Sequence, residues 1–256
     1  MVNKLKYPVL AYHKITKQWE ISYTMLYPHN FERQMRYLAT NGYVGKSLRE
    51  YLTDPKYNYF VLTFDDAYES VYKNAYPLLK ELGFSATVFV LTNYIGKNNT
   101  WDFTPGNIFS RHMNVEQLKT LHQEGWEVAS HGENHRAMTG LHPDSVIHEL
   151  KHSKELISSL IDDEVETFCF PFGVYNANVV AAAKSCGYKN LVGFTEPSRY
   201  GVISRSAVYR TVDSRLSVLR KIRRYPFDLF FEGIKEGIIH SFSLFSRLAQ
   251  RFRKSK

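Results

Sequence analysis

The sequence predicts an α/β fold and, within that class, a (β/α) barrel of parallel strands. Short apolar runs alternate along the chain with segments of helical periodicity, an order that produces parallel strands in β–α units. Glycine follows several of the helical segments, as it commonly does where a helix ends. A chain of 256 residues can hold one core of this kind, since barrels of about 200–250 residues are ordinary single domains.

Six apolar runs are the strand candidates, because each is rich in β-branched or aromatic residues and is bounded by polar or turn residues. They span residues 9–12, 60–64, 86–91, 127–129, 167–170 and 191–194. The helix candidates lie between them, and Asn114 and Asp144 are the expected N-caps of two. These helices span residues 31–41, 72–82, 115–124, 145–160 and 177–186. The strand count is not fixed by this pattern.

The charge distribution divides the chain into residues 1–214 and a tail of residues 215–256. The tail holds eleven Lys or Arg and three Asp or Glu, so the net charge of +8 belongs to it and the remainder is neutral. This distribution argues against a nucleic-acid-binding catalytic domain. Aromatic and aliphatic residues recur every three or four positions from Phe227 to Phe252, which predicts a basic amphipathic helix. Such a helix can bind an anionic membrane surface, or pack its apolar stripe on the barrel or on a second subunit.

The amino-terminal segment and the cysteines bear on the compartment. The apolar run after Met1 is too short for a signal peptide and fits a first strand better. Two cysteines, Cys169 and Cys186, do not make a disulfide framework and are compatible with a reducing compartment. We therefore expect a cytoplasmic protein, peripheral at the inner face of the membrane if the tail binds lipid.

Polar clusters follow three of the predicted strands, and in barrels the active site lies at the carboxyl ends of the strands. Asp65 and Asp66 are consecutive and can point in different directions, although an Asp pair is also common at a helix N-cap or turn. His131 and His135 lie four residues apart and can share a metal; the alternative is two histidines on the surface or at the edge of the core. With a carboxylate from another strand, they form a two-His, one-carboxylate set suited to Zn²⁺ and related ions.

The third cluster is a loop that follows the strand candidate at residues 167–170. Proline and glycine around an aromatic residue make a rigid loop whose backbone N–H groups can approach a ligand. A hydrophobic loop packed on the core is an equally good interpretation. The residues are Pro171, Phe172, Gly173 and Tyr175.

In this order the clusters resemble the motifs of the polysaccharide deacetylase family (carbohydrate esterase family 4, the NodB-homology domain). Thr63-Phe64-Asp65-Asp66 matches its first motif, with Ala67 in place of Gly. His131 and His135 match the second, and Pro171-Phe172-Gly173 the third. The resemblance covers residues 7–212 and includes Tyr12-His13-Lys14-Ile15.

Two features depart from the family pattern. Cys169 stands near the place of the usual third-motif arginine, and the late Leu-x-x-His motif is missing, since His240 in the tail is only superficially similar. Both departures resemble the branch that contains the poly-N-acetylglucosamine deacetylases.

The resemblance implies a distorted or incomplete barrel of the polysaccharide deacetylase type and a metal-dependent hydrolysis. By this resemblance Asp66, His131 and His135 hold the divalent metal, which we expect to be Zn²⁺, with Co²⁺ or Ni²⁺ as alternatives. Asp65 is then the general base, and a backbone N–H near Phe172 stabilises the developing oxyanion.

Two further assignments keep an alternative. His13 is the candidate general acid in place of the missing late-motif histidine, but it can equally be a buried structural residue. Trp101 is assigned to the substrate site with Pro171, Phe172, Gly173 and Tyr175, because aromatic rings offer flat apolar faces to sugars. Core packing is the alternative for Trp101, as it is for Trp126.

The expected activity is removal of N-acetyl groups from a poly- or oligosaccharide, or from a lipid-linked or nucleotide-linked sugar. The expected partner is thus an N-acetylated carbohydrate and not a nucleic acid. One alternative is a non-catalytic carbohydrate-binding or scaffold protein that keeps the fold, but such a protein has no need of Asp65 beside the metal. Another is a metal-dependent amidase that acts on a non-sugar substrate.

Overall fold

The computed structural model describes residues 9–18, 24–101, 110–194 and 200–208, with Arg215, Val218, Leu219 and Lys221. The amphipathic helix expected in the tail lies outside these residues, as does His240. In the part of the chain that is described, no helix is both long and apolar enough to cross a membrane.

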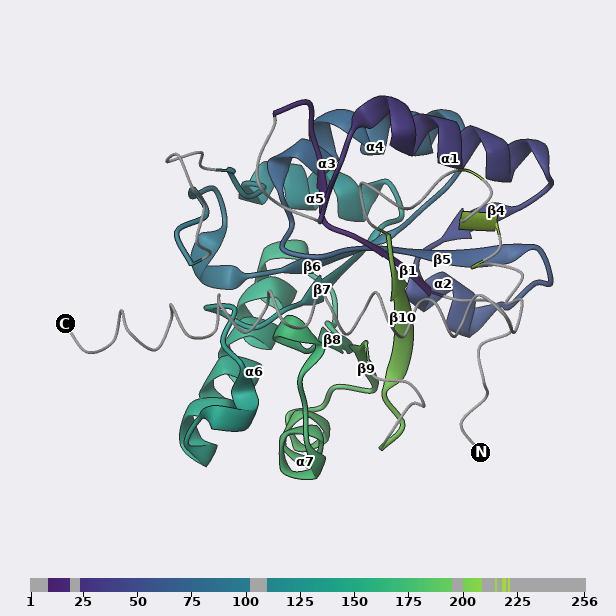
Figure 1. Ribbon diagram of the computed structural model, residues 1–256. Coiled ribbons are helices and arrows are strands. Elements are labelled where there is room, and N and C mark those ends of the chain that lie inside the picture. Colours follow the sequence, from purple (N-terminus) through teal and green to yellow (C-terminus); the bar gives the residue numbers. More distant parts are fainter. Residues whose placement is uncertain are drawn as a thin grey trace.

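Parallel strands form a closed barrel, as the sequence predicts (Figure 1). The ring closes because β1 pairs with β10 on one side and with β5 on the other. Its strands are β1 (Val9–Tyr12), β5 (Tyr59–Phe64), β6 (Thr87–Val90), β7 (Glu127–Ser130), β8 (Thr167–Cys169), β9 (Asn190–Gly193) and β10 (Ile203–Ala207). All six predicted strands are present, and β10 is an addition.

Three short strands were not predicted besides β10. The strand β4 (Val44–Lys46) pairs with the first half of β5, whose second half pairs with β6. Gly45 of β4 has no room for a side chain, because a Cβ would lie 2.7 Å from Leu62 and 2.9 Å from Phe84. The strands β2 (Lys14–Ile15) and β3 (Met25–Leu26) form a separate parallel pair.

Helices surround the barrel: α1, α3, α4 and α5 lie on one side of it and α6 and α7 on the other (Figure 1). The α-helices are α1 (Pro28–Thr40), α2 (Leu48–Thr53), α3 (Glu69–Asn74), α4 (Tyr76–Glu81), α5 (Val115–Gln123), α6 (Pro143–Ile161) and α7 (Ala177–Ser185). The short 3₁₀ helices are η1 (Thr92–Tyr94), η2 (Met138–Gly140) and η3 (Pro171–Gly173).

Two helical predictions need correction. The single helix expected over residues 72–82 is two helices, α3 and α4, because Pro77 lacks the N–H that would continue the first one. The N-cap of α6 is His142 and not Asp144, since Pro143 takes the first helical position and Asp144 falls in the first turn. Asn114 caps α5 as expected, through a capping box with Gln117.

The barrel strands bury both faces. One set of side chains packs outward against the helices, and the alternate set fills the interior of the barrel. The interior cluster is Val9, Leu48, Tyr51, Val61, Phe89, Ala129, Cys169 and Val192. Since side chains alternate with a period of two, His13, Asp65 and His131 continue the interior series of β1, β5 and β7 beyond the strand ends.

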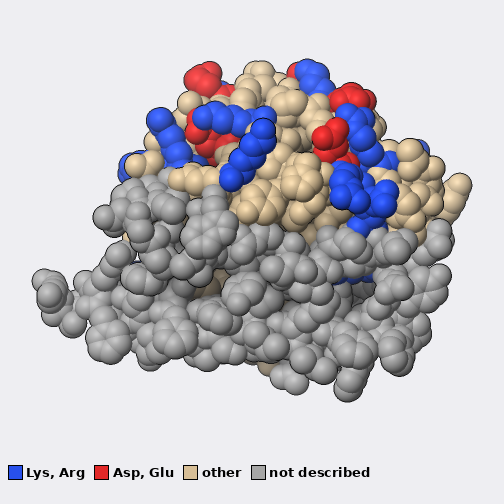
Figure 2. All heavy atoms as spheres, turned by 45° about the horizontal axis from the view of Figure 1, so that its top comes forward, with Lys and Arg blue, Asp and Glu red and all other residues tan. Residues whose placement is uncertain are grey.

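Several charged side chains on the helical face form ion pairs. Arg36 on α1 lies 2.8 Å from both Glu32 and Glu81, and Lys80 lies 2.7 Å from Glu124. In the view that brings this side of the molecule forward, acidic side chains lie among the basic ones (Figure 2). Among the described residues of this face, charges of both signs are therefore mixed.

Candidate active site

The carboxyl ends of β1, β5, β7 and β8 converge on one group of buried or half-buried polar side chains. Asp65 and Asp66 directly follow β5, and His131 directly follows β7. His13 follows β1, and Cys169 is the last residue of β8. Because parallel strands end at the same rim of a barrel, residues far apart in sequence meet at this rim.

Asp66, His131 and His135 form the first part of the site. The Asp66 Oδ1 atom lies 3.7 Å from Nε2 of His131 and 3.6 Å from Nε2 of His135. All three side chains are nearly inaccessible to solvent. Asp66 and Ala67 both have left-handed backbone conformations, with φ of 66° and 48°, and this turn separates the direction of Asp66 from that of Asp65. The family motif has glycine where Ala67 stands, which suits the same conformation.

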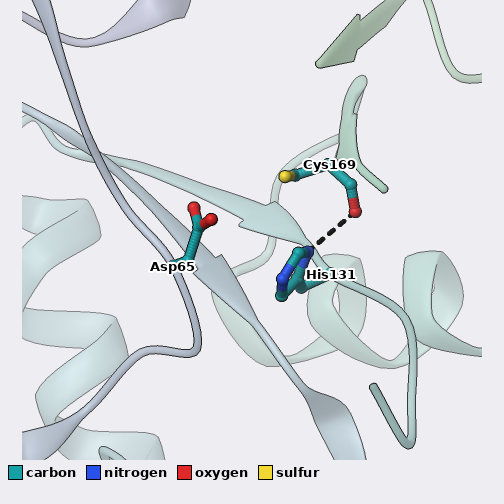
Figure 3. Close-up of side chains that lie close together, drawn as sticks. All are labelled: Asp65, His131 and Cys169. Carbon is teal, nitrogen blue, oxygen red and sulfur yellow. Dashed lines mark hydrogen bonds between the residues drawn. The ribbon is translucent and has the colours of Figure 1, made fainter. Parts of the chain in front are cut away.

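Hydrogen bonds fix the orientation of this group. Nδ1 of His131 lies 2.8 Å from the carbonyl oxygen of Cys169 (Figure 3). Only a protonated Nδ1 can donate to that carbonyl, so in the neutral imidazole the Nε2 lone pair faces Asp66. The backbone oxygen of Asp66 accepts from Nδ1 of His112 at 2.6 Å. Burial lowers the pKa of both His131 and His135, which keeps the two imidazoles neutral.

These residues fit a divalent metal. One carboxylate oxygen and two imidazole nitrogens approach within 4.8 Å of one another, and neutral histidines with free lone pairs are the form that binds metal. Metal-binding histidines usually donate their other ring N–H to a carbonyl or carboxylate, as His131 does to Cys169, and this fixes the orientation of the ring. The structure thus brings the three predicted ligands, Asp66, His131 and His135, together.

Asp65 lies beside this group but points to a different partner. It forms a two-pronged ion pair with Arg205 of β10, at 2.6 Å and 2.8 Å. Burial alone would raise the pKa of Asp65, but the charge and hydrogen bonds of Arg205 outweigh burial and hold the pKa well below its usual range. Asp65 is thus a carboxylate with a fixed orientation and a permanent negative charge near neutral pH.

Arg205 is the main site residue that the sequence analysis missed. Its guanidinium also lies 3.0 Å from Thr63 Oγ1 and 3.0 Å from Cys169 Sγ, and its side chain is completely buried. Cys169 stands near the position of the missing motif arginine, and its side chain points toward the same space as Asp65 (Figure 3). The absence of the third-motif arginine was a usable signal in the sequence. A buried carboxylate base still needs a cation beside it, so another Lys or Arg was to be expected near Asp65.

His13 is close to the same carboxylate. Its Nε2 atom lies 3.6 Å from Oδ2 of Asp65, and its side chain keeps 19% of its exposure. Burial lowers the pKa of His13 to about 4, although Asp65 acts in the opposite direction. His13 is therefore neutral at pH 7 and lies within reach of both Asp65 and solvent.

An aromatic group borders His135. The Trp101 ring stacks on the His135 ring at 3.7 Å between centroids, and the Phe172 ring meets His135 edge-on at 4.3 Å. Phe172 has a φ of 58°, and a Cβ at Gly173 would lie 2.7 Å from Phe194, so this loop turn needs glycine. Trp101 and Phe172 are thus at the site, next to a predicted metal ligand.

The remaining predicted substrate residues do not border His135 in the way that Trp101 and Phe172 do. Pro171 and Gly173 are buried in the turn that carries Phe172. The Tyr175 ring packs on Phe170 at 5.0 Å, in the cluster between barrel and helices. A substrate role for Tyr175 stays a prediction. Trp126 stacks on Phe64 and is a core residue.

Comparisons with known proteins agree with the geometry. The family model described as polysaccharide deacetylase matches residues 53–191. The putative polysaccharide deacetylase YxkH of Bacillus subtilis is 30% identical over 242 residues, which cover 90% of this chain and 77% of that protein. The poly-β-1,6-N-acetyl-D-glucosamine N-deacetylase of Staphylococcus aureus is 25% identical over 219 residues, 73% of each chain.

Solved structures share the fold. The Streptococcus pyogenes deacetylase PplD, determined in complex with acetate, superposes with a TM-score of 0.73 at 23% identity, covering 84% of this chain and 97% of that one. IcaB from Ammonifex degensii superposes with a TM-score of 0.69 at 18% identity, covering 82% and 94%.

Proposed function

This chain belongs to the polysaccharide deacetylase family, and on that premise we propose that it is a metal-dependent hydrolase that removes N-acetyl groups from an N-acetylated poly- or oligosaccharide. The observation that carries the proposal is that a possible metal-ligand set and an ionised carboxylate lie side by side at one rim of the barrel. Asp66, His131 and His135 converge as a ligand set, and the ionised Asp65 lies beside them. A protein that only bound carbohydrate would have no use for a buried, charged carboxylate in that position.

The ligand set favours Zn²⁺, with Co²⁺ and Ni²⁺ as alternatives, because two imidazoles and one carboxylate leave positions open. A divalent metal bound there would lower the pKa of a coordinated water towards ~7 and polarise the acetyl carbonyl. Asp66 would hold the metal through a carboxylate oxygen, and His131 and His135 would each hold it through a ring nitrogen.

Asp65 is the proposed acceptor of the proton from the attacking water. Its pKa is held low by Arg205, so it is ionised throughout the neutral range and needs no prior deprotonation. Arg205 fixes the plane of this carboxylate through two hydrogen bonds, and we assign it as a positioning residue. A backbone N–H near Phe172 would donate to the acetyl oxygen as negative charge develops, an effect worth about 3–4 kcal/mol in comparable sites.

The proposed substrate is a polymer or oligomer of N-acetylglucosamine. The Staphylococcus aureus relatives are named for poly-β-1,6-N-acetyl-D-glucosamine, and the Trp101 and Phe172 rings provide apolar surface beside the ligand set. The test is acetate release from β-1,6- and β-1,4-linked N-acetylglucosamine oligomers, compared with small acetamides. Acetate from an oligomer supports the proposal. Acetate only from the small amides indicates an amidase, and oligomer binding without acetate release indicates a binding protein.

We expect His13→Ala to lower turnover by about 10²–10⁴-fold, the range usual for an acid–base group. His13 is neutral at pH 7, so it would receive from Asp65 the proton that Asp65 takes from the attacking water, and pass that proton to the departing amine. The melting temperature should change little, because the side chain is partly exposed and carries no charge. A large fall in melting temperature, with normal turnover in the folded fraction, would indicate the structural alternative.

The pH profile gives a second check on His13. If His13 is already protonated in the free enzyme, it cannot take up a further proton during the reaction. The acid limb of kcat/KM that depends on His13 should therefore have its midpoint near pH 4, below the ordinary imidazole pKa of 6.5. Activity governed by His13 is therefore retained as the pH falls from 7 to 5. An acid limb near 6.5 that disappears in His13→Ala would contradict this assignment.

We also propose that the basic tail attaches the protein to the cytoplasmic face of the membrane, a proposal supported by sequence alone. Each Lys or Arg near anionic lipid contributes about 1 kcal/mol, and eleven are present from residue 215 onward. The full-length chain should float with anionic liposomes at low salt, whereas a chain that ends at Asp213 should not. If both remain in the soluble fraction, the tail has a packing role instead.

A further inference from the structure

A second cluster of metal-binding side chains lies on the far side of the loop that carries the predicted catalytic ligands. Glu133 lies in this loop between His131 and His135, but its carboxylate contacts α6. Its Oε1 atom is 2.5 Å from Nδ1 of His152, and its Oε2 atom is 3.2 Å from Nε2 of His148. We propose that Glu133, His148 and His152 form a second divalent-metal site, distinct from the one at the barrel rim.

The geometry favours a shared ion. His148 and His152 are one helical turn apart on α6, and their rings lie nearly parallel, with centroids 5.4 Å apart. The three ligand atoms all lie within 4.8 Å of one another. Two imidazole nitrogens and one carboxylate oxygen are the donors that Zn²⁺ and neighbouring late first-row ions prefer.

Burial gives a second, independent argument. The Glu133 side chain is only 5% exposed, and a buried carboxylate is stable only beside a cation or several donors. Within the described part of the chain, the side-chain partners of this carboxylate are these two imidazoles, and neither Lys nor Arg is among them. Arg136, the nearby guanidinium, is directed to Glu149 instead. A metal would supply the missing positive charge.

The cluster is open to ions from solution. The His148 and His152 side chains are 69% and 50% exposed, so water can fill the remaining coordination positions. A pocket of about 320 Å³ borders the cluster, with Asn93, Asp144 and Ser145 also in its lining. The site at the barrel rim is buried by contrast, which predicts faster exchange and weaker binding here.

The site would also position the loop. Glu149 of α6 accepts from the backbone N–H groups of Glu133 and Asn134, at 2.8 Å and 3.2 Å. A metal held by Glu133 and the two α6 histidines would add a second tie between α6 and the loop. Because that loop supplies His131 and His135, occupancy of the second site should stabilise the first.

The test counts zinc ions per full-length chain after equilibrium dialysis against micromolar zinc. We expect two in the unaltered protein, one in His148→Ala/His152→Ala, and one in His131→Ala/His135→Ala. His142→Ala, which removes an exposed histidine at the N-cap of the same helix, should keep two. Glu133→Gln is a second probe and should lose one ion without removing either imidazole.

The outcomes separate this site from the proposed catalytic one. If His148→Ala/His152→Ala binds as much zinc as the unaltered chain, the second site does not exist. The same holds if His131→Ala/His135→Ala, shown to be folded by circular dichroism, binds none. If the unaltered chain binds a single ion that only the α6 variant loses, the second site stands and the metal proposal for the barrel rim fails.

Discussion

His131→Ala is expected to abolish metal binding at the barrel rim and deacetylase activity with it, while the fold survives. The substitution removes one of three ligands and the hydrogen bond that orients it on Cys169. Removing the imidazole takes away that hydrogen bond, at a cost of about 1–3 kcal/mol, compared with a total stability of about 5–15 kcal/mol. The measurement is zinc content and acetate release on the same preparation.

The experiment is clearest in a His148→Ala/His152→Ala background, where zinc content reports the rim alone. His142→Ala in that background is the control, since His142 is exposed and touches neither cluster. One bound zinc per chain together with full activity in His131→Ala would show that the ligand set is misassigned. A loss of both, with an unchanged circular dichroism spectrum, would support it.

The parts of the fold that follow from local patterns were predictable. The apolar runs of β1 and β5–β9 favour strands, because they are short, flanked by turn residues and separated by helical segments. The period of two then carries His13, Asp65 and His131 to one interior face, so the central group was predictable from strand assignment alone.

The parts that depend on tertiary contacts were not. Arg205 lies in Ile203–Ala207, a strand with several polar residues whose sequence does not indicate a buried position. The ion pair with Asp65 explains why the charge of Arg205 is tolerated inside the barrel. The strand β4 needs glycine at Gly45 because the Leu62 side chain approaches closely there, and no sequence pattern indicates that contact. Glu133 meets His148 and His152 only through the packing of the loop against α6, and the sequence separation of these residues gives no sign of that contact.

The second prediction of large effect concerns the base. Asp65→Asn should retain zinc at the rim and lose activity by about 10²–10⁴-fold, because an amide cannot accept the proton that the carboxylate accepts. Asp65 is not a member of the set formed by Asp66, His131 and His135, although it lies with His131 and Cys169 in another possible set, so zinc retained in Asp65→Asn distinguishes a base from a ligand. Acetate release and zinc content are measured together.

The ion pair with Arg205 means that Asp65→Asn changes stability as well as activity, and a second substitution at Arg205 can separate the two effects. Removing one partner of a buried ion pair costs about 3–5 kcal/mol, since Arg205 would keep its charge without the carboxylate. Asp65→Asn should therefore unfold at a lower temperature, and Asp65→Asn/Arg205→Met should recover much of the loss because both charges are gone. Neither variant should recover activity if Asp65 is the base. An active double variant with an ordinary pH profile would show that the pair is structural, whereas a stable and inactive one that still holds zinc isolates the chemical role of Asp65.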